Sequence, residues 1–253
     1  MRPVILVIAG VLAPVLLVLD LSSAPEEAGA QLGPGRLPPP PKAGGMALAE
    51  ALWNRRSARR FDGRPVTREE LGYLLWAGSG LNRPGEKKRT APSAWEAYAI
   101  TIYVTSPAGT SIYDPAEHAL RPAGGAGPGG TGAAGGLAQK DLRSEIPRAE
   151  GTRTAPVVLV LVADFSRYPA RASPESRRFL AHADCGAIAE NIYLAATALG
   201  LGTVVTADAR PESRGLLGLG EEQMALYVMP VGHPAPEVPA AEPQRKDGQG
   251  GKN

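Results

Sequence analysis

The stretch Pro156-Val157-Val158-Leu159-Val160-Leu161-Val162-Ala163 carries no polar side chain at any position. Successive side chains of a strand point to opposite faces of its sheet, so a strand without polar positions must be covered on both faces. We therefore expect 156–163 to form a central strand of a sheet that has packed layers on either side.

Other segments show the two-residue period of a strand or the spacing of a helix. Apolar and polar residues alternate from Ile100 to Thr105, which predicts a half-buried strand. Thr67 with Glu70 three residues later forms a capping box that opens a helix through Gly78. Two further strands are predicted over 203–206 and 224–231, and further helices over 47–55, over 181–200 and from Pro211 onward. The helices do not alternate evenly with the strands, which favours an α+β sandwich over a doubly wound fold.

Composition excludes several classes of protein. The 253 residues include 27 Lys and Arg against 25 Asp and Glu, and only 5% are aromatic. A dedicated nucleic-acid binder would show a stronger basic bias and more stacking rings. One cysteine excludes an intrachain disulfide framework and a Cys-rich metal site, and the three histidines lack metal-binding spacing. No metal ligand is therefore predicted.

The N-terminus has the layout of a secretory signal. Arg2 precedes an apolar run from Val4 to Leu19, and Ala28-Gly29-Ala30 resembles a cleavage site. We expect 1–30 to be a signal peptide or an uncleaved N-terminal anchor. Either one places the folded part outside the cytoplasmic membrane, so that the protein is secreted, periplasmic or membrane-anchored.

The rest of the chain divides by composition. Residues 31–45 form a Pro/Gly-rich tether that we expect to be extended and unable to pack a core. A folded domain is predicted over 46–247, interrupted by a Gly-rich surface loop at 122–136. Residues 248–253 are predicted to be a disordered tail.

Arginines gather directly after the first helix of this domain, in the sequence Arg55-Arg56-Ser57-Ala58-Arg59-Arg60-Phe61. Arginine binds phosphate oxygens bidentately and keeps its charge, so this cluster is suited to an organic phosphate. The alternative is a solvated basic patch. Phe61 and Pro65 anchor the cluster to the fold, which favours a binding site.

Other local motifs do not match known nucleotide-binding or hydrolytic sites. Gly200-Leu201-Gly202 follows a helix and precedes a strand, which is the reverse of a dinucleotide-binding loop, and Val205 stands where a third glycine is needed. No nucleophile elbow is present, and we expect Cys185 to be a small core residue. No catalytic side chain is predicted.

The chain as a whole resembles the nitroreductase family of flavin enzymes, and more closely its SagB-type (thiazoline/oxazoline dehydrogenase) branch and secreted bacterial relatives. The similar stretches, in chain order, are Gly44-Gly45-Met46 leading into ALAEALWNRRSARRF, then LGYLLWAGSGLNRP, RTAPSA, APVVLVLVAD, NIYLAATALGLGTVV and VMPVGHP. In close relatives Asn and Gln tend to follow the Pro-Ser-Ala motif, whereas here Trp95-Glu96-Ala97-Tyr98 follows it.

This resemblance implies a nitroreductase-like sandwich with a central, mostly antiparallel sheet flanked by helices. It also implies an intertwined homodimer with one FMN at each of two subunit interfaces. By the same resemblance Arg55, Arg56, Ser57 and Arg59 would contact the phosphate and ribityl chain, and Arg245 would be a late basic residue at the phosphate. Pro92, Ser93 and Ala94 would meet the flavin from the partner subunit, and Val205, Thr206 and Ala207 would approach its ring.

The function implied is an FMN-dependent oxidoreductase that transfers hydride between reduced flavin and a small organic acceptor, with NAD(P)H or an unknown reductant as donor. Two alternatives remain at this point. One is an azoline-type dehydrogenase on the same FMN site. The other is a non-catalytic secreted binding protein on this scaffold.

Overall fold

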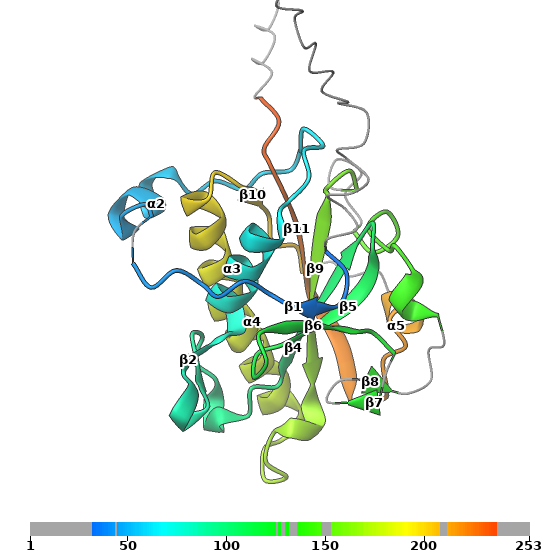
Figure 1. The fold of residues 1–253 in the computed structure, drawn as a ribbon. Helices are drawn as coiled ribbons and strands as arrows, with labels where there is room; N and C mark the ends of the chain where they lie inside the picture. Colours follow the sequence, from blue (N-terminus) through cyan, green and yellow to red (C-terminus); the bar gives the residue numbers. More distant parts are fainter. Residues whose placement is uncertain are drawn as a thin grey trace, which may run out of the picture.

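The computed structural model describes residues 32–43, 45–124, 126–127, 130–131, 136–147, 153–207 and 212–236. Within this part, one antiparallel sheet of seven strands has the order β1-β6-β5-β4-β9-β11-β10 (Figure 1). Its strands are β1 (Gly35–Arg36), β4 (Ile100–Ser106), β5 (Gly109–Asp114), β6 (Ala119–Pro122), β9 (Val157–Asp164), β10 (Gly202–Thr203) and β11 (Gln223–Gly232). Two small hairpins lie outside it, β2 (Leu81–Arg83) with β3 (Lys88–Arg89) and β7 (Ala126–Gly127) with β8 (Gly130–Thr131).

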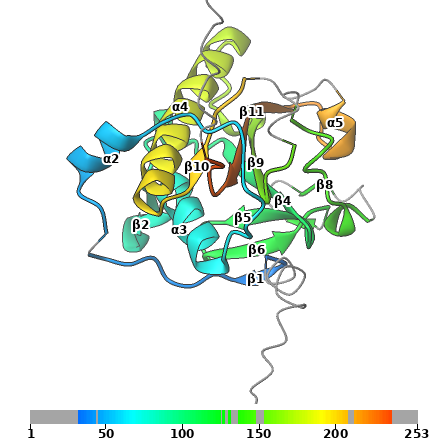
Figure 2. The same cartoon turned by 90° about the horizontal axis from the view of Figure 1, so that it is seen from above.

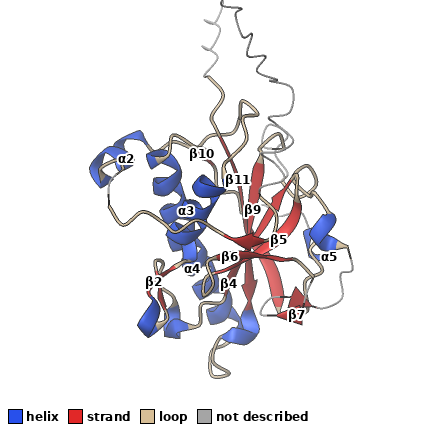
Figure 3. Cartoon of the chain, in the orientation of Figure 1, coloured by secondary structure: helices blue, strands red, loops and turns tan. Residues whose placement is uncertain are grey.

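The helices are concentrated on one face of the sheet. Figures 2 and 3 show α2, α3 and α4 together on one side and the short α5 on the other. Their bounds are α2 (Leu48–Asn54), α3 (Arg68–Ser79), α4 (Pro174–Ala198) and α5 (Ser213–Leu216). Short 3-10 turns complete the structure at Pro84–Glu86, Ala94–Glu96, Leu137–Gln139 and Phe165–Arg167. This arrangement confirms the expected α+β class with an antiparallel sheet flanked by helices.

Strand β9 is the centre of the molecule, as its apolar sequence predicts. It pairs with β4 on one side and β11 on the other, and residues 157–163 are all at most 1% exposed. Its alternate residues enter two separate cores, one beneath α3 and α4 and one on the opposite face. A strand enclosed in this way needs apolar side chains in both directions.

Two predicted helices are found with different bounds. The capping box is present: the Thr67 hydroxyl accepts the Glu70 N–H, and the Glu70 carboxylate accepts the Thr67 N–H. Helix α4, expected from residue 181, begins at Pro174 with Ser173 as its N-cap. Its first two turns are rich in polar residues, so apolar periodicity could not detect them.

The Pro/Gly-rich stretch before the domain is not a free tether, which corrects the expectation that it cannot pack a core. Leu32 and Leu37 are buried in the core under α3, and β1 pairs with the edge strand β6. The Arg68 guanidinium donates to the carbonyl oxygens of Gly33 and Arg36. These contacts supply the hydrogen-bond partners that a proline-rich segment cannot find within itself.

Strands β5 and β6 were not anticipated, because they are short and follow turn-forming residues. The stretch 122–136, predicted to be a surface loop, is described at 122–124, 126–127, 130–131 and 136. Pro122 ends β6, Ala123 is buried and the small hairpin β7–β8 follows, which corrects the prediction at these residues. The predictions for 1–30 and 248–253 lie outside the described part. In the part of the chain that the structure describes, no helix is long and apolar enough to span a membrane.

Candidate functional site

The arginine-rich segment after α2 runs along the edge of the sheet at β10. Ser57 forms a parallel bridge with Thr203, and the Ala58 N–H donates to the Thr203 carbonyl oxygen at 2.9 Å. A β-carbon on Gly202 would lie 2.4 Å from the Ala58 β-carbon, so the absence of a side chain at Gly202 permits this close approach. Gly202, the second glycine of the pair that does not fit a nucleotide-binding loop, therefore has a packing role.

Tyr193 of α4 connects three of the predicted site residues. Its hydroxyl oxygen accepts the Val205 N–H at 2.8 Å and lies 3.3 Å from the Ser57 hydroxyl oxygen. The Arg55 guanidinium lies over the Tyr193 ring, 5.2 Å from its centroid. Sequence reasoning missed Tyr193, and the available signal was a tyrosine on the apolar face of an Ala-rich helix.

The cluster presents positive charge to solvent at this edge. Arg55 is partly buried, whereas Ser57 and Arg59 are exposed. Arg55 and Arg59 have no ion pair with any acidic side chain among the described residues. Guanidinium groups without carboxylate partners beside an exposed hydroxyl are a donor set that suits a phosphate group.

The backbone at Val205 and Thr206 lies beside the same cluster. Thr206 exchanges two backbone hydrogen bonds with Val228 of β11, each 2.9 Å long, and Ala207 is exposed at the end of this segment. The structure thus brings Arg55, Ser57 and the 205–206 backbone together. Arg245 falls outside the described residues.

Within one chain, the Pro92-Ser93-Ala94 loop does not lie beside the arginine cluster. The Ser93 hydroxyl donates to Asp184 of α4 at 2.6 Å and accepts the Tyr98 N–H at 2.9 Å. Asp184 and Tyr193 are nine positions apart on the helix, which corresponds to about 13 Å along its axis. The loop and the arginine cluster therefore lie along different parts of α4.

Asp184 fixes this loop and was also missed by sequence reasoning. Besides Ser93 it accepts a hydrogen bond from the Tyr168 hydroxyl at 3.3 Å. Burial raises the pKa of the Asp184 carboxyl above its ordinary value, and hydrogen bonds from Ser93, the Ala94 backbone and Tyr168 oppose that rise only in part. The neighbouring Cys185 is buried in the core as expected, and burial raises the pKa of its thiol.

The segment after Ala94 has a strained backbone. Trp95 and Glu96 have φ angles of 54° and Tyr98 has a φ angle of 44°. Residues with side chains rarely adopt this left-handed region, and such strain concentrates at functional sites. Three of the four residues at 95–98, where the sequence departs from the pattern of close relatives, are therefore held in unusual conformations, and Ala97 is the exception.

A solvent-exposed apolar surface lies near the arginine cluster, on α2. Leu48, Leu52 and Trp53 are 65%, 55% and 87% exposed. A groove of about 290 Å³ between α2, α3 and α4 includes Leu48, Trp76 and Leu194 among its lining residues. A cluster of large exposed apolar side chains is typical of a contact surface.

Comparison with known proteins gives a consistent result. The family model described as "Nitroreductase family" matches residues 52–233. A Methanocaldococcus jannaschii protein whose name assigns it to the nitroreductases, MJ1384, is 32% identical over 198 residues, which is 74% of this chain and 91% of the relative.

Solved structures agree. A crystal structure from Ralstonia eutropha JMP134, described as that of a nitroreductase, is 33% identical with a TM-score of 0.71 and covers 83% of this chain and 93% of its own. Nitroreductase A from Vibrio parahaemolyticus shares the fold with a TM-score of 0.53 at 21% identity, covering 82% of this chain and 79% of its own. Since the family model and a relative both match most of the folded part, the chain belongs to the nitroreductase family.

Proposed function

We propose that this protein is an FMN-dependent oxidoreductase that transfers hydride between reduced flavin and a small organic acceptor. Nitroreductase-family proteins are oxidoreductases that generally use flavin cofactors. The observation that carries the proposal is the convergence on Tyr193, which joins Arg55, Ser57 and the Val205 backbone in one site.

The residues of this site fit a flavin mononucleotide. Arg55, Arg56, Ser57 and Arg59 would hold its phosphate and ribityl chain, with Arg245 as a further basic residue. The Val205–Ala207 backbone would lie against its ring. The flavin supplies the hydride chemistry when bound, so the protein needs to provide binding, orientation and hydrogen bonds rather than an acid or base.

We further propose a homodimer in which the Pro92-Ser93-Ala94 loop of one subunit reaches the site of the other. In this dimer two copies of α4 would pack antiparallel about a two-fold axis that passes midway between Asp184 and Tyr193. Asp184 of one helix would then lie at the same height as Tyr193 of the other. The loop held by Asp184 would then approach the partner's arginine cluster. The exposed apolar surface of α2 supports an interface on this side of the molecule.

Arg59→Ala tests the flavin site. Loss of one charge-assisted phosphate contact should weaken FMN binding by about 1.5–3 kcal/mol, or about ten- to hundredfold. The measurement is the ratio of flavin to protein absorbance after purification, followed by an FMN titration. Arg64→Ala is the control, since Arg64 is also exposed but is ion-paired to Asp62. Equal flavin content in both variants would contradict the assignment.

The cell compartment bears on the electron donor. We propose export through 1–30, and because NAD(P)H is scarce outside the cytoplasm, the donor is either NAD(P)H or an unidentified reductant. An azoline-type dehydrogenase, as in the SagB-type branch, would use the same flavin site with electrons flowing from substrate to flavin. Anaerobic mixing distinguishes the two: NAD(P)H bleaches the flavin band of a reductase, whereas an azoline-containing peptide bleaches that of a dehydrogenase. A protein that remains colourless after incubation with FMN would instead be a binding protein.

A further inference from the structure

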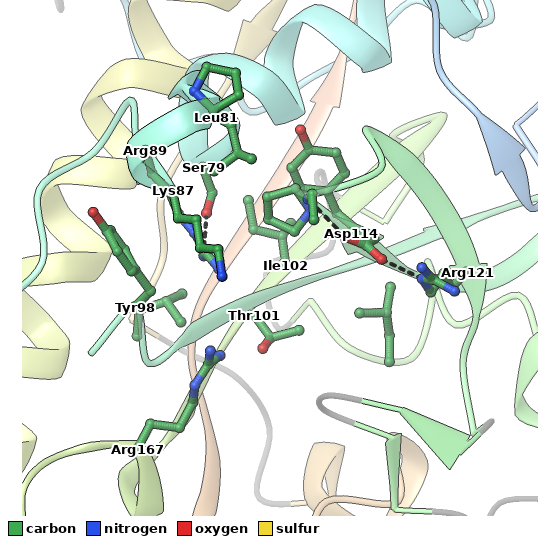
Figure 4. A pocket seen from close by; sticks show the side chains of 16 residues that line it. Ser79, Leu81, Lys87, Arg89, Tyr98, Thr101, Ile102, Asp114, Arg121 and Arg167 are labelled. Carbon is green, nitrogen blue, oxygen red and sulfur yellow. Dashed lines mark hydrogen bonds and ion pairs between the residues drawn. The ribbon is translucent and has the colours of Figure 1, made fainter. Parts of the chain in front are cut away.

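A separate cavity of about 550 Å³ is lined by residues from both faces of the sheet, since Ile102 belongs to the core under α3 and α4 and Ile112 to the core on the opposite face. It lies between the C-terminal end of α3, the hairpin β2–β3 and strands β4 to β6 (Figure 4). Leu81, Ile102, Ile112 and Tyr113 give it apolar walls, and this volume falls in the range of small-molecule sites.

Arg89 is the principal polar group of this cavity. Its guanidinium donates to the Ser79 hydroxyl at 3.0 Å and lies over the Tyr98 ring, 4.7 Å from the centroid. Among the described residues it forms no ion pair with a carboxylate. Burial, together with the nearby Arg167 guanidinium, lowers the pKa of Arg89 to about 10. The fold therefore holds a desolvated cation in place without a counter-ion.

The other charges of the cavity do not neutralise Arg89. Lys87, Arg121 and Arg167 also line it, and Asp114 is the one acidic residue among its described lining residues. Asp114 is ion-paired with Arg121, as Figure 4 shows. Arg167 is exposed, and its side chain reaches toward the cavity from the loop after β9. Subtracting the Asp114–Arg121 pair leaves three cations around an apolar cavity.

We propose that this cavity binds a small organic carboxylate, with the carboxylate on Arg89 and an apolar body against Ile102 and Ile112. The planar guanidinium fork matches a carboxylate geometrically, and a partly desolvated ion pair is stronger than one in water. An inorganic anion would leave the apolar walls without a partner, whereas an organic anion satisfies both features of the cavity.

This site is separate from the arginine cluster at Ser57. Positions along β9 give the separation between the two sites. The cavity lies at Ile100–Ile102 of β4, which pair with Leu161–Ala163 of β9. Thr203 pairs with Val231 of β11, and Val231 pairs with Val157 of β9. Four to six residues of strand separate the two levels, or about 13–20 Å. Ser79, Arg89 and Tyr98 also line a small hollow that extends to Pro92, Ser93 and Asp184. Arg89 therefore lies between the cavity and the loop that Asp184 holds.

Calorimetric titration of the purified protein with naphthalene-2-carboxylate and with naphthalene-2-carboxamide tests the proposal. The two probes have the same apolar body and differ in charge. We expect the carboxylate to bind at least about tenfold more tightly, because only it can pair with Arg89. Equal affinities, or no binding of either probe, would overturn the proposal.

Three variants test whether the carboxylate binds in this cavity. Arg89→Gln keeps a donor for Ser79 but removes the charge, and we expect it to weaken carboxylate binding by about tenfold or more. Arg167→Gln, at an exposed position, should weaken it several-fold without affecting folding. Arg64→Gln, an exposed arginine outside the cavity, should leave it unchanged. Carboxylate affinity that is insensitive to both Arg89 and Arg167 would refute the assignment.

Flavin content separates this proposal from the proposed function. Both cavity variants should retain the flavin content of the unaltered protein. The carboxylate should also bind equally well to protein stripped of flavin. If the carboxylate competes with FMN, the cavity is part of the flavin site and the inference of a separate site is wrong. If no flavin binds at all, the carboxylate result stands by itself.

Discussion

At the scale of single residues, two side chains of α4 organise the two halves of the site. Tyr193 holds the Ser57 and Val205 region, and Asp184 holds the loop that contains Ser93. Each is a polar group within a helix whose other inward-facing residues are apolar. Such groups are retained in a core only when hydrogen bonds compensate for their burial, and here those bonds include Ser93 for Asp184 and the Val205 N–H for Tyr193.

The Asp184 carboxyl should give stability a characteristic pH dependence. Because its folded-state pKa is raised, the folded protein binds more protons than the unfolded chain between the two pKa values. The Asp184 carboxyl therefore makes its full contribution to the free energy of unfolding at pH values below 3.8, the ordinary pKa of an aspartate. That contribution is lost as the pH rises through the raised pKa of the folded protein. Denaturant unfolding of the unaltered protein and of Asp184→Asn across this range measures it. The stability difference between the two should vary with pH, and a constant difference would show that Asp184 ionises normally.

Backbone strain at Glu96 should be relieved by glycine. Glu96 has a φ angle of 54°, and a left-handed conformation costs a side-chain-bearing residue about 1–2 kcal/mol. Its ion pair with Lys88 is screened by solvent and offsets only part of this cost. Glu96→Gly should therefore raise the melting temperature. Glu86→Gly, at an exposed position of ordinary φ, should lower it, and a fall in both variants would argue against strain in this loop.

At the scale of elements, the packing of the 55–61 segment on β10 positions the arginines. Ser57 and Phe61 bridge to Thr203 and Pro234, so the segment is held at two points along its length. Arg55 and Arg56 therefore lie just after the end of α2, at the start of an extended segment that these bridges hold against the sheet. The distance between these arginines and Val205 depends on how closely the segment approaches Gly202.

Gly202→Ala should disturb this approach. The added methyl group would lie 2.4 Å from the Ala58 β-carbon and 2.8 Å from the Pro234 ring, so the segment must move. Overpacking of this kind costs about 1–3 kcal/mol, and the arginines should shift with the segment. We expect lower stability together with weaker FMN retention. Gly215→Ala in α5, where the methyl group meets nothing, is the control. Unchanged FMN retention in Gly202→Ala would separate the segment from the flavin site.

In the molecule as a whole, the Pro92-Ser93-Ala94 loop and the arginine cluster lie about 13 Å apart along α4, and we propose that a second subunit brings them together. The exposed apolar surface of α2, formed by Leu48, Leu52 and Trp53, is the surface on which we propose the second copy packs. In such a dimer, dimerisation and flavin binding would be linked, because the partner's loop would complete each site.

Trp53→Glu tests this linkage by sedimentation velocity and flavin content. Placing a charge on the proposed interface should raise the dimer dissociation constant by at least about tenfold, since an unpaired charge at an interface costs several kcal/mol. Met224→Glu, at an exposed apolar residue on β11, should leave the dimer intact. A Trp53→Glu variant that remains dimeric would place the interface elsewhere, and one that is monomeric yet retains its flavin would argue against a shared site.

Most elements that bury an apolar face could be predicted from the sequence. Strand β9, strand β4, the capped start of α3 and the strand over 224–231 have periodic or continuous apolar patterns, and the structure contains each of them. The first two turns of α4 and the short strands β5 and β6 carry little such signal. The stretch from Leu32 to Leu37 was misjudged because its prolines and glycines outweigh two leucines in composition, although those two leucines are buried.

The residue types of the proposed site could be recognised in the amino-acid sequence: a cluster of guanidinium groups beside a serine, and a glycine pair that cannot be a nucleotide loop. The hydrogen bonds of Tyr193 and Asp184, and the position of Arg89 in a cavity with no carboxylate partner among the described residues, emerged from the packing of the elements. Local sequence patterns report which face of an element is apolar. Contacts between side chains far apart in the sequence depend on how those elements pack.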